Sequence, residues 1–410
     1  MSASDQARST QASWGAIALA NLQGWFPENR REFISIAVLY ASIYALSGAL
    51  ETTPYNAHVY LAQAFLEGHF HVDNLPEFME ETHLNGHKYI AYGITPALVM
   101  MPFVAIWGLA FHQSLYFALL GGVAVAVWHS VLGKLELQPA WRHMLTTVMG
   151  LGSLFWFYAG DGGRTWWIMH VATVLFLLIA IRDCVGKQRA WVAGLAFGLA
   201  VLSRQSVFLG LPFFVGMLWR DDRSQGGLGV AGKAWRFALP LAALLAFNCF
   251  YNYARFGAPL DNGYARVISE TDTLAHGFFS THYLQENLRL YLFGVPQRLE
   301  RFPWFDTTMG GFSIFISTPA LLLAFFADWR ARINQLALLA VLGIGTFYMF
   351  YYWSGFTQFG CRYSLDFLPF ALLLVASAVR DRWLEALRTC LLAGITVQVW
   401  GLFWWMHKGW

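Results

Sequence analysis

Charged residues are scarce in this chain of 410 residues. Aspartate, glutamate, lysine and arginine make up only 12% of it, whereas 57% of the residues are hydrophobic. Soluble domains carry roughly 25% charged residues, so an ordinary soluble domain is excluded. The net charge of +3 is also small, and it gives no reason to expect nucleic acid as a partner.

Cysteine is equally rare, with four residues scattered over the chain. They form no CxxC pair, so the pattern offers no support for a zinc-finger or redox site. The sequence also contains no internal repeat and no low-complexity tract. Many transporters are built from repeats, so their absence favours an enzyme over a carrier.

Long apolar segments are what the chain has in abundance. A run of about 18 or more apolar residues is typical of a transmembrane helix. We therefore predict an all-α polytopic membrane protein with about eleven or twelve transmembrane or re-entrant helices. The apolar segments are 33–50, 94–110, 115–133, 143–159, 166–181, 190–203, 206–219, 237–252, 311–327, 335–352, 364–379 and 387–406.

The orientation follows from the lysines and arginines in the short loops, because cytoplasmic loops are enriched in these residues. If all the basic loops are cytoplasmic, residues 51–93 and 253–310 form two long extracytoplasmic loops. Residues 1–32 are then a cytoplasmic tail, and residues 33–410 form one transmembrane domain. Long aromatic loops rich in His, Asp, Glu and Arg are typical of functional sites.

One stretch conflicts with a simple alternation of spans. Residues 94–134 hold two apolar segments but must cross the membrane an odd number of times. Pro96 and Pro102 favour a re-entrant or interfacial segment 94–110, because broken helices are tolerated where they line protein. The alternative is that the loop around Lys134 lies outside.

Two carboxylates in the first long loop are candidate catalytic groups. Glu51 ends the first apolar segment, where a carboxylate can act as a general base facing a cavity at membrane level. The other interpretation is an ordinary helix-end carboxylate in interfacial water. Asp73 is a second candidate acid, with the same alternative. Between them, residues 55–67 have the pattern of an amphipathic helix on the membrane plane.

Two arginines are predicted at the same membrane depth. Arg204 ends an apolar helix, and Arg362 precedes another one in the stretch WSGFTQFGCRYSLDFLPFALLLV. A guanidinium forms a fork that suits phosphate oxygens, whereas snorkelling to lipid headgroups is the other explanation for Arg204. One carboxylate and two arginines at extracytoplasmic helix ends suit a substrate with a lipid phosphate.

Four further residues are predicted to bind substrate, namely Tyr55, His58, Tyr264 and Gln358. Aromatic side chains stack on sugar faces, although an interfacial aromatic belt is the usual reason for such residues. We expect no cofactor. A divalent metal ion bound by the His-x-His pair at His69 and His71 stays an alternative, although that spacing fits no closed zinc pattern.

Five segments in this order resemble the integral-membrane glycosyltransferases of the GT-C fold, the group that includes protein mannosyltransferases and lipid A aminoarabinose transferases. They are ETTPYNAHVYLAQAFLEGHFHVDN, NGHKYIAYGITPALVMMPF, WVAGLAFGLAVLSRQSVFLGLPFF, YNYARFGAPLDNGY and WSGFTQFGCRYSLDFLPF. In that family an acidic residue just after the first span is the catalytic base, and this position is Glu51 here. Many members carry an Asp or an acidic pair there, so Asp73 stays the alternative base.

The resemblance implies a polyprenyl-phosphate sugar as donor and a hydroxyl of a glycan, lipid or protein as acceptor. We therefore expect an inverting glycosyltransferase in the bacterial inner membrane, whose active site faces outward to the cell envelope. The alternative is a transporter or flippase of a lipid-linked sugar, in which the same arginines only bind the substrate.

Overall fold

The computed structural model describes residues 29–161, 163–186, 188–219, 229–268, 275–307, 310–379 and 383–408. Most of the predicted cytoplasmic tail, residues 1–28, therefore lies outside the described residues. The first helix already begins at Arg30, because Asn29 caps it by accepting a hydrogen bond from the backbone N–H of Glu32 at 3.2 Å.

The described chain is mainly helical and has only two short hairpins, which agrees with the predicted all-α polytopic class. Six of its helices are long and apolar enough to cross a membrane, and they identify the chain as an integral membrane protein. These helices are α2 (Arg30–Tyr44) with its continuation η1 (Ala45–Ala49), α5 (Gln113–Lys134), α8 (Thr165–Val185), α11 (Val230–Phe256), α15 (Arg332–Phe350) and α17 (Leu384–Lys408).

The other helices are shorter, and some of them lie in the long loops rather than in the predicted apolar segments. They are α3 (Ala57–Leu66), α4 (Thr95–Trp107), α6 (Pro139–Gly150), α7 (Phe155–Gly160), α9 (Ala190–Ser203), α10 (Leu211–Leu218), α12 (Tyr264–Ile268), α13 (Leu284–Leu288), α14 (Ile314–Ser317) and α16 (Leu368–Ala378). Short 3₁₀ or π helices are η2 (Gly108–Ala110), η3 (Gln205–Gly210), η6 (Thr281–Tyr283), η7 (Arg289–Phe293), η8 (Pro319–Phe326) and η9 (Arg362–Asp366).

The predicted re-entrant segment corresponds to α4. This helix has 13 residues and contains Pro102, so it is about 20 Å long, which is shorter than the roughly 30 Å hydrocarbon core of a bilayer. A second predicted span, 143–159, is broken into α6 and α7. A Cβ on Gly150, the last residue of α6, would lie 2.1 Å from the ring of Tyr40, so glycine at this position lets α2 pack closely against the end of α6.

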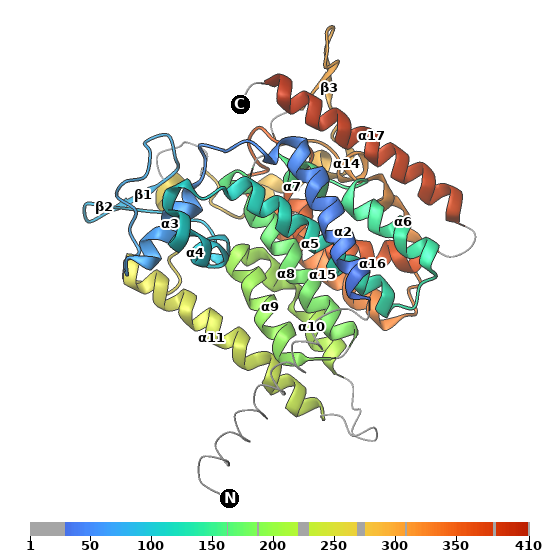
Figure 1. Cartoon of the computed structure of the whole chain (residues 1–410), viewed down its shortest axis with the longest axis horizontal. Coiled ribbons are helices and arrows are strands. Elements are labelled where there is room, and N and C mark those ends of the chain that lie inside the picture. The colour runs from blue at the N-terminus through green and yellow to red at the C-terminus, as the bar shows by residue number, and fades with distance from the viewer. Residues whose placement is uncertain are drawn as a thin grey trace, which may run out of the picture.

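The long helices lie side by side in one bundle (Figure 1). The centre is formed by α8, which contacts α5 on one side and α9 on the other, while α11 packs on the outer side of α9. Helices α2 and α5 approach closely, since a Cβ on Gly122 would lie 2.3 Å from the carbonyl oxygen of Ala37. Small residues at such crossings are typical of helices packed in membranes.

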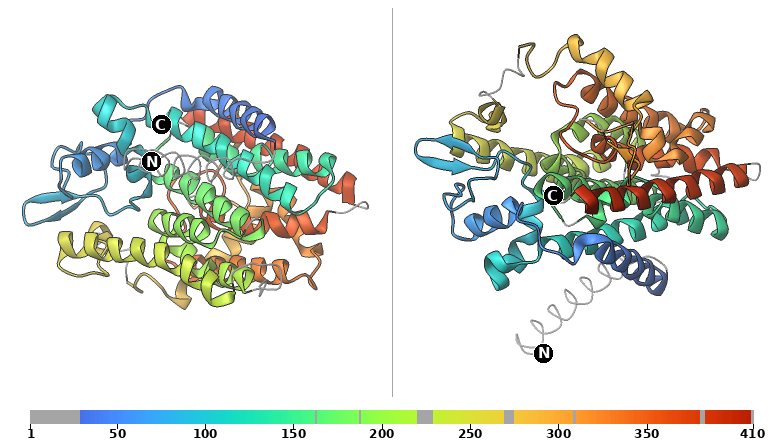
Figure 2. Two further views of the ribbon diagram at one scale, coloured as in Figure 1. Left: turned by 60° about the horizontal axis from the view of Figure 1, so that its bottom comes forward. Right: turned by 90° about the horizontal axis from the view of Figure 1, so that it is seen from above.

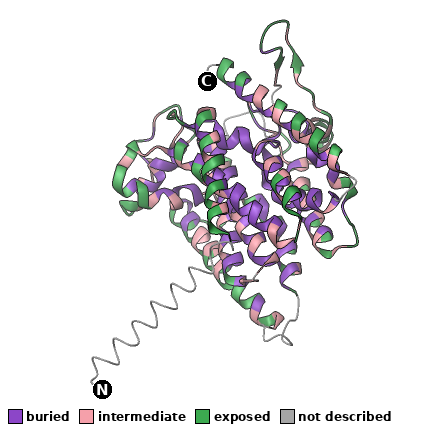
Figure 3. Ribbon diagram, turned by 45° about the vertical axis from the view of Figure 1, so that its right-hand side comes forward, coloured by how far each residue is buried: buried purple, intermediate pink, exposed green. Residues whose placement is uncertain are grey.

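The surface of the bundle is apolar. Buried residues fill its interior and exposed ones cover the outer helix faces (Figure 3). Large hydrophobic side chains such as Leu46, Ile106, Leu239 and Phe250 are exposed on these faces. A lipid bilayer is the solvent that suits them.

The two long loops contain structure of their own and lie at the ends of the helices (Figure 2). The first holds α3 and an antiparallel hairpin of β1 (Thr82–Leu84) and β2 (His87–Tyr89), with Thr82 opposite Tyr89. Its turn has positive φ at Asn85 and Gly86, as in a type I′ turn. The second contains a short hairpin of β3 (Gln297–Arg298) and β4 (Phe305–Asp306).

Candidate substrate cavity

A large cavity of about 900 Å³ lies where the first loop meets the ends of α8, η3, α11, α15 and η9. Its wall is rich in aromatic rings, among them Tyr55, Trp166, Tyr264 and Tyr351. A cavity of this size, largely apolar with a few polar groups that converge on it, is the usual form of a small-molecule site. We refer to this end of the bundle as the cavity end.

Four arginines line the cavity, and each of them has partners within the protein. Arg255 donates to the carbonyl oxygen of Ile90 at 2.8 Å and to Oδ1 of Asn252 at 2.9 Å. The Nε of Arg164 lies 3.9 Å from Oδ2 of Asp161. This is the pairing expected for neighbouring charges on a glycine-rich turn.

Arg204 belongs to a buried polar network around Asp366. The Nε of Arg204 donates to Oδ2 of Asp366 at 3.1 Å, and its Nη2 donates to the hydroxyl of Tyr348 at 2.9 Å. The same carboxylate accepts hydrogen bonds from Tyr348, from the hydroxyl of Ser206 at 3.0 Å and from Nδ1 of His170 at 2.7 Å. The charge of Arg204 is therefore compensated inside the protein, so snorkelling to lipid headgroups does not describe it.

The fourth arginine is Arg362, which interacts with the side chain of its neighbour Tyr363. It is 9% exposed and lines the cavity, and its guanidinium carbon lies 5.2 Å from the ring centroid of Tyr363. Within the part of the chain that the structure describes, no acidic side chain forms an ion pair with it. A buried guanidinium without a carboxylate is costly unless an anion joins it, so Arg362 is the group best placed to receive one.

The backbone around Arg362 explains why the sequence is rich in glycine there. Gly355 and Gly360 have φ of 118° and 59°, values that favour glycine. A Cβ on Gly311, also at positive φ, would lie 1.9 Å from the carbonyl oxygen of Gly360. Only glycine at position 311 lets the two loops approach this closely next to the Arg362 turn.

The structure does not bring the two predicted catalytic carboxylates to the cavity wall. Glu51 follows η1 and its side chain is exposed. Asp73 is also exposed and accepts hydrogen bonds from the backbone N–H of Lys88 at 3.1 Å and from Nδ1 of His87 at 3.0 Å. The Lys88 N–H, helped by the nearby histidines, holds the pKa of Asp73 below its usual value. Neither residue lines the cavity.

Glu80 is the one acidic side chain, among the described residues, that lines the cavity. Its Oε2 accepts hydrogen bonds from the hydroxyl of Tyr92 and from the indole N–H of Trp166, the latter at 3.3 Å. Sequence reasoning missed this residue, because Glu80 lies within an acidic run with Glu77 and Glu81. No local pattern distinguishes it from these neighbours.

The other predicted binding residues divide into two pairs. Tyr55 and Tyr264 line the cavity. His58 and Gln358 are fully buried behind the wall. The Nε2 of His58 lies 2.9 Å from the carbonyl oxygen of Gly93, and the amide of Gln358 donates to the carbonyl oxygens of Gly310 and Ser354 at 2.5 and 2.9 Å. Both side chains therefore hold backbone that borders the cavity.

The histidines of the first loop form a stack on its surface. The rings of His69 and His71 lie 4.2 Å apart, and His71 is in turn 4.2 Å from His87. His69 itself lies 3.0 Å from Glu67 through Nε2. The group with the spacing of metal ligands is thus His71, Asp73 and His87, rather than the His69–His71 pair that the sequence indicated.

Comparison with known proteins adds nothing to this geometry. A scan against protein-family models, a search of curated proteins and a search of solved structures each gave no match.

Proposed function

We propose that this integral membrane protein is a glycosyltransferase. It would transfer a sugar from a polyprenyl-phosphate donor to an acceptor hydroxyl of a glycan, lipid or protein at the extracytoplasmic face. The observation that carries the proposal is Arg362, a buried guanidinium in the wall of a large cavity without an acidic partner among the described residues. A phosphate is the anion whose geometry matches the guanidinium fork.

The remaining wall suits the other parts of such a donor. Tyr55 and Trp166 lie 5.2 Å apart between ring centroids, and aromatic faces of this kind pack against the apolar face of a sugar. The glycosyltransferase resemblance of the segments around Glu51, Arg204 and Arg362 points to the same class. Its donor would be a lipid-linked sugar.

The chemistry needs one base and one group that stabilises the leaving phosphate. The base removes the proton of the acceptor hydroxyl, whose oxygen attacks the anomeric carbon from the face opposite the phosphate, so that the configuration inverts. Arg362 would stabilise the negative charge that develops on the departing phosphate. Glu80 is the carboxylate within the cavity wall, whereas Glu51 and Asp73 need a change in the first loop to reach it.

Reconstitution tests this function directly. The purified chain in liposomes is given polyprenyl-phosphate sugars and a mixture of acceptors, and both the glycosylated product and the released polyprenyl phosphate are measured. Sugar transfer that falls in Arg362→Ala supports the enzyme. Movement of intact lipid-linked sugar across the bilayer without cleavage would instead support a flippase. If neither transfer nor movement is detected, both the glycosyltransferase and the flippase are contradicted.

A further inference from the structure

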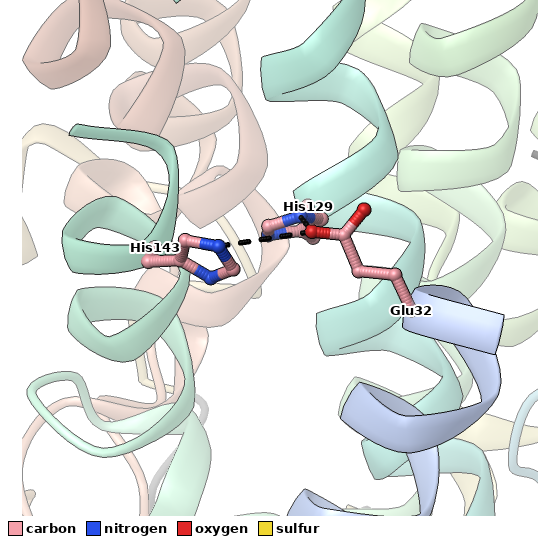
Figure 4. Close-up of side chains that lie close together, drawn as sticks. All are labelled: Glu32, His129 and His143. Carbon is pink, nitrogen blue, oxygen red and sulfur yellow. Dashed lines mark hydrogen bonds and ion pairs between the residues drawn. The ribbon is translucent and has the colours of Figure 1, made fainter. Parts of the chain in front are cut away.

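A second cluster of chemically active side chains lies at the opposite end of the bundle. Glu32 stands in the first turn of α2, His129 is near the end of α5, and His143 is on α6. Glu32 is at the start of α2, whereas the residues that follow the other end of this helix lead to Tyr55 in the cavity wall. This cluster therefore has no part in the proposed sugar transfer. Figure 4 shows that the three side chains point toward one another.

The donor atoms of the cluster are close together. Oε1 of Glu32 lies 3.0 Å from Nε2 of His129 and 3.7 Å from Nε2 of His143, and all the potential ligand atoms lie within 4.8 Å of one another. Zinc is bound at about 2.0–2.2 Å by nitrogen and oxygen ligands, so the ligand atoms of a tetrahedral site are roughly 3.3–3.5 Å apart. The observed separations bracket this value.

The protonation of His129 is determined by its neighbour on α6. The hydroxyl of Thr146 donates its proton to the carbonyl oxygen of Arg142 at 2.7 Å. Its oxygen, 2.7 Å from Nδ1 of His129, can then only accept a proton from that nitrogen. The neutral His129 ring thus carries its lone pair on Nε2 and directs it at the Glu32 carboxylate.

Two acceptors that face each other at 3.0 Å repel unless a cation lies between them. His129 is 2% exposed, so water cannot relieve this repulsion freely. A carboxylate and two imidazoles are the donor set of zinc-type ions, whereas calcium and magnesium prefer oxygen ligands throughout. The hydrogen bond from His129 to Thr146 has the form of the outer contact that orients a metal-ligating histidine.

Arg142 is the positively charged side chain that lies next to the proposed metal position. Its Nη2 lies 3.4 Å from Oε2 of Glu32, and its Nε donates to the carbonyl oxygen of His129 at 3.0 Å. The guanidinium therefore faces the oxygen of Glu32 that does not point at the two imidazoles. One carboxylate oxygen is left for a metal, and the other is held by a hydrogen bond of the outer shell.

We propose that Glu32, His129 and His143 bind one Zn²⁺-type ion that ties α2, α5 and α6 together, with water as the fourth ligand. Three protein ligands from three helices would cross-link the bundle at the end opposite the cavity. We assign it a structural role, because none of the three residues lines the substrate cavity.

The test measures zinc on the purified full-length chain without a histidine tag. The background carries His71→Ala and His87→Ala, which remove the second group of metal-ligand spacing. After chelator treatment, the protein is reloaded with Zn²⁺ and desalted, and bound zinc is counted by mass spectrometry. About one Zn²⁺ per chain is expected on this background, and Co²⁺ loaded in its place should give the visible absorption of tetrahedral coordination.

On the same background, Glu32→Gln and His143→Ala should each lose the bound zinc. The His143 side chain is 60% exposed, so its removal leaves the fold intact, and circular dichroism verifies this. Thr146→Val keeps the shape but removes the outer hydrogen bond, and it should weaken zinc binding about 10–100-fold. A background protein that binds no zinc, or a His143→Ala variant that binds as much, overturns the proposal and leaves only a proton between Glu32 and His129. Sugar transfer is measured separately, so either proposal can fail alone.

Discussion

Arg204 and Asp366 lie 162 positions apart in the chain and form an ion pair of 3.1 Å at the cavity wall. Asp366 is fully buried and also accepts hydrogen bonds from His170, Ser206 and Tyr348. Arg362 belongs to the same short turn as Asp366 but has no such partner in the described residues. The two arginines that the sequence indicated as equivalent are therefore different. One is neutralised by the protein and the other is available to an anion.

The first prediction concerns Arg362. Replacing it by alanine removes a charge-assisted contact worth about 1.5–3 kcal/mol, so use of a polyprenyl-phosphate donor should fall roughly tenfold to a hundredfold. Arg362→Lys should cost less, because the charge is kept while the fork is lost. Donor affinity is measured by titration of the purified protein. An alanine variant with the affinity of the parent would make Arg362 a purely structural residue.

The second prediction concerns stability. Asp366→Asn removes the buried carboxylate that neutralises Arg204, and breaking such a pair costs about 3–5 kcal/mol of the free energy of unfolding. The matched control is Glu385→Gln, which breaks the exposed pair of Glu385 with Arg388 at 2.5 Å. Exposed pairs contribute only about 0.2–1 kcal/mol. Unfolding in a detergent mixture compares the two, and equal losses would refute the distinction between the sites.

The third prediction identifies the catalytic base. Glu80→Gln, Glu51→Gln and Asp73→Asn each replace a carboxylate by an amide of the same shape. The change at the true base should lower turnover by about 10²–10⁴ while donor binding is kept. We expect this loss for Glu80, because it is the carboxylate in the cavity wall. A loss confined to Glu51→Gln or Asp73→Asn would mean that the first loop rearranges to bring that residue to the substrate.

The fourth prediction is topological. Single cysteines are introduced in a variant that lacks the four native ones, at the exposed positions Asn74 and Gln285 in the two long loops and at Gln138 between α5 and α6. In intact cells an impermeant maleimide should label Asn74→Cys and Gln285→Cys but not Gln138→Cys, because cytoplasmic loops are enriched in lysine and arginine. The reverse pattern would turn the cavity toward the cytoplasm and exclude an extracytoplasmic donor.

Much of the architecture could be predicted from the sequence alone. The prediction of an integral membrane protein follows from the length and apolarity of the segments, which are local properties. Six helices of spanning length confirm it. The amphipathic pattern at 55–67 likewise predicts α3 (Ala57–Leu66). The break between α6 and α7 was not predicted, because both helices lie within one continuous apolar segment, residues 143–159.

The candidate site was only partly visible in the sequence. Arg204 and Arg362 are recognisable, since a guanidinium at the mouth of an apolar segment is unusual in any membrane protein. The tertiary structure alone decided that Arg204 pairs with Asp366 and that Glu80, rather than Glu51 or Asp73, lines the cavity. The length of an apolar segment is a property of consecutive residues, so the sequence alone determines it. The pairing of charges depends on atoms that meet only after the helices have packed.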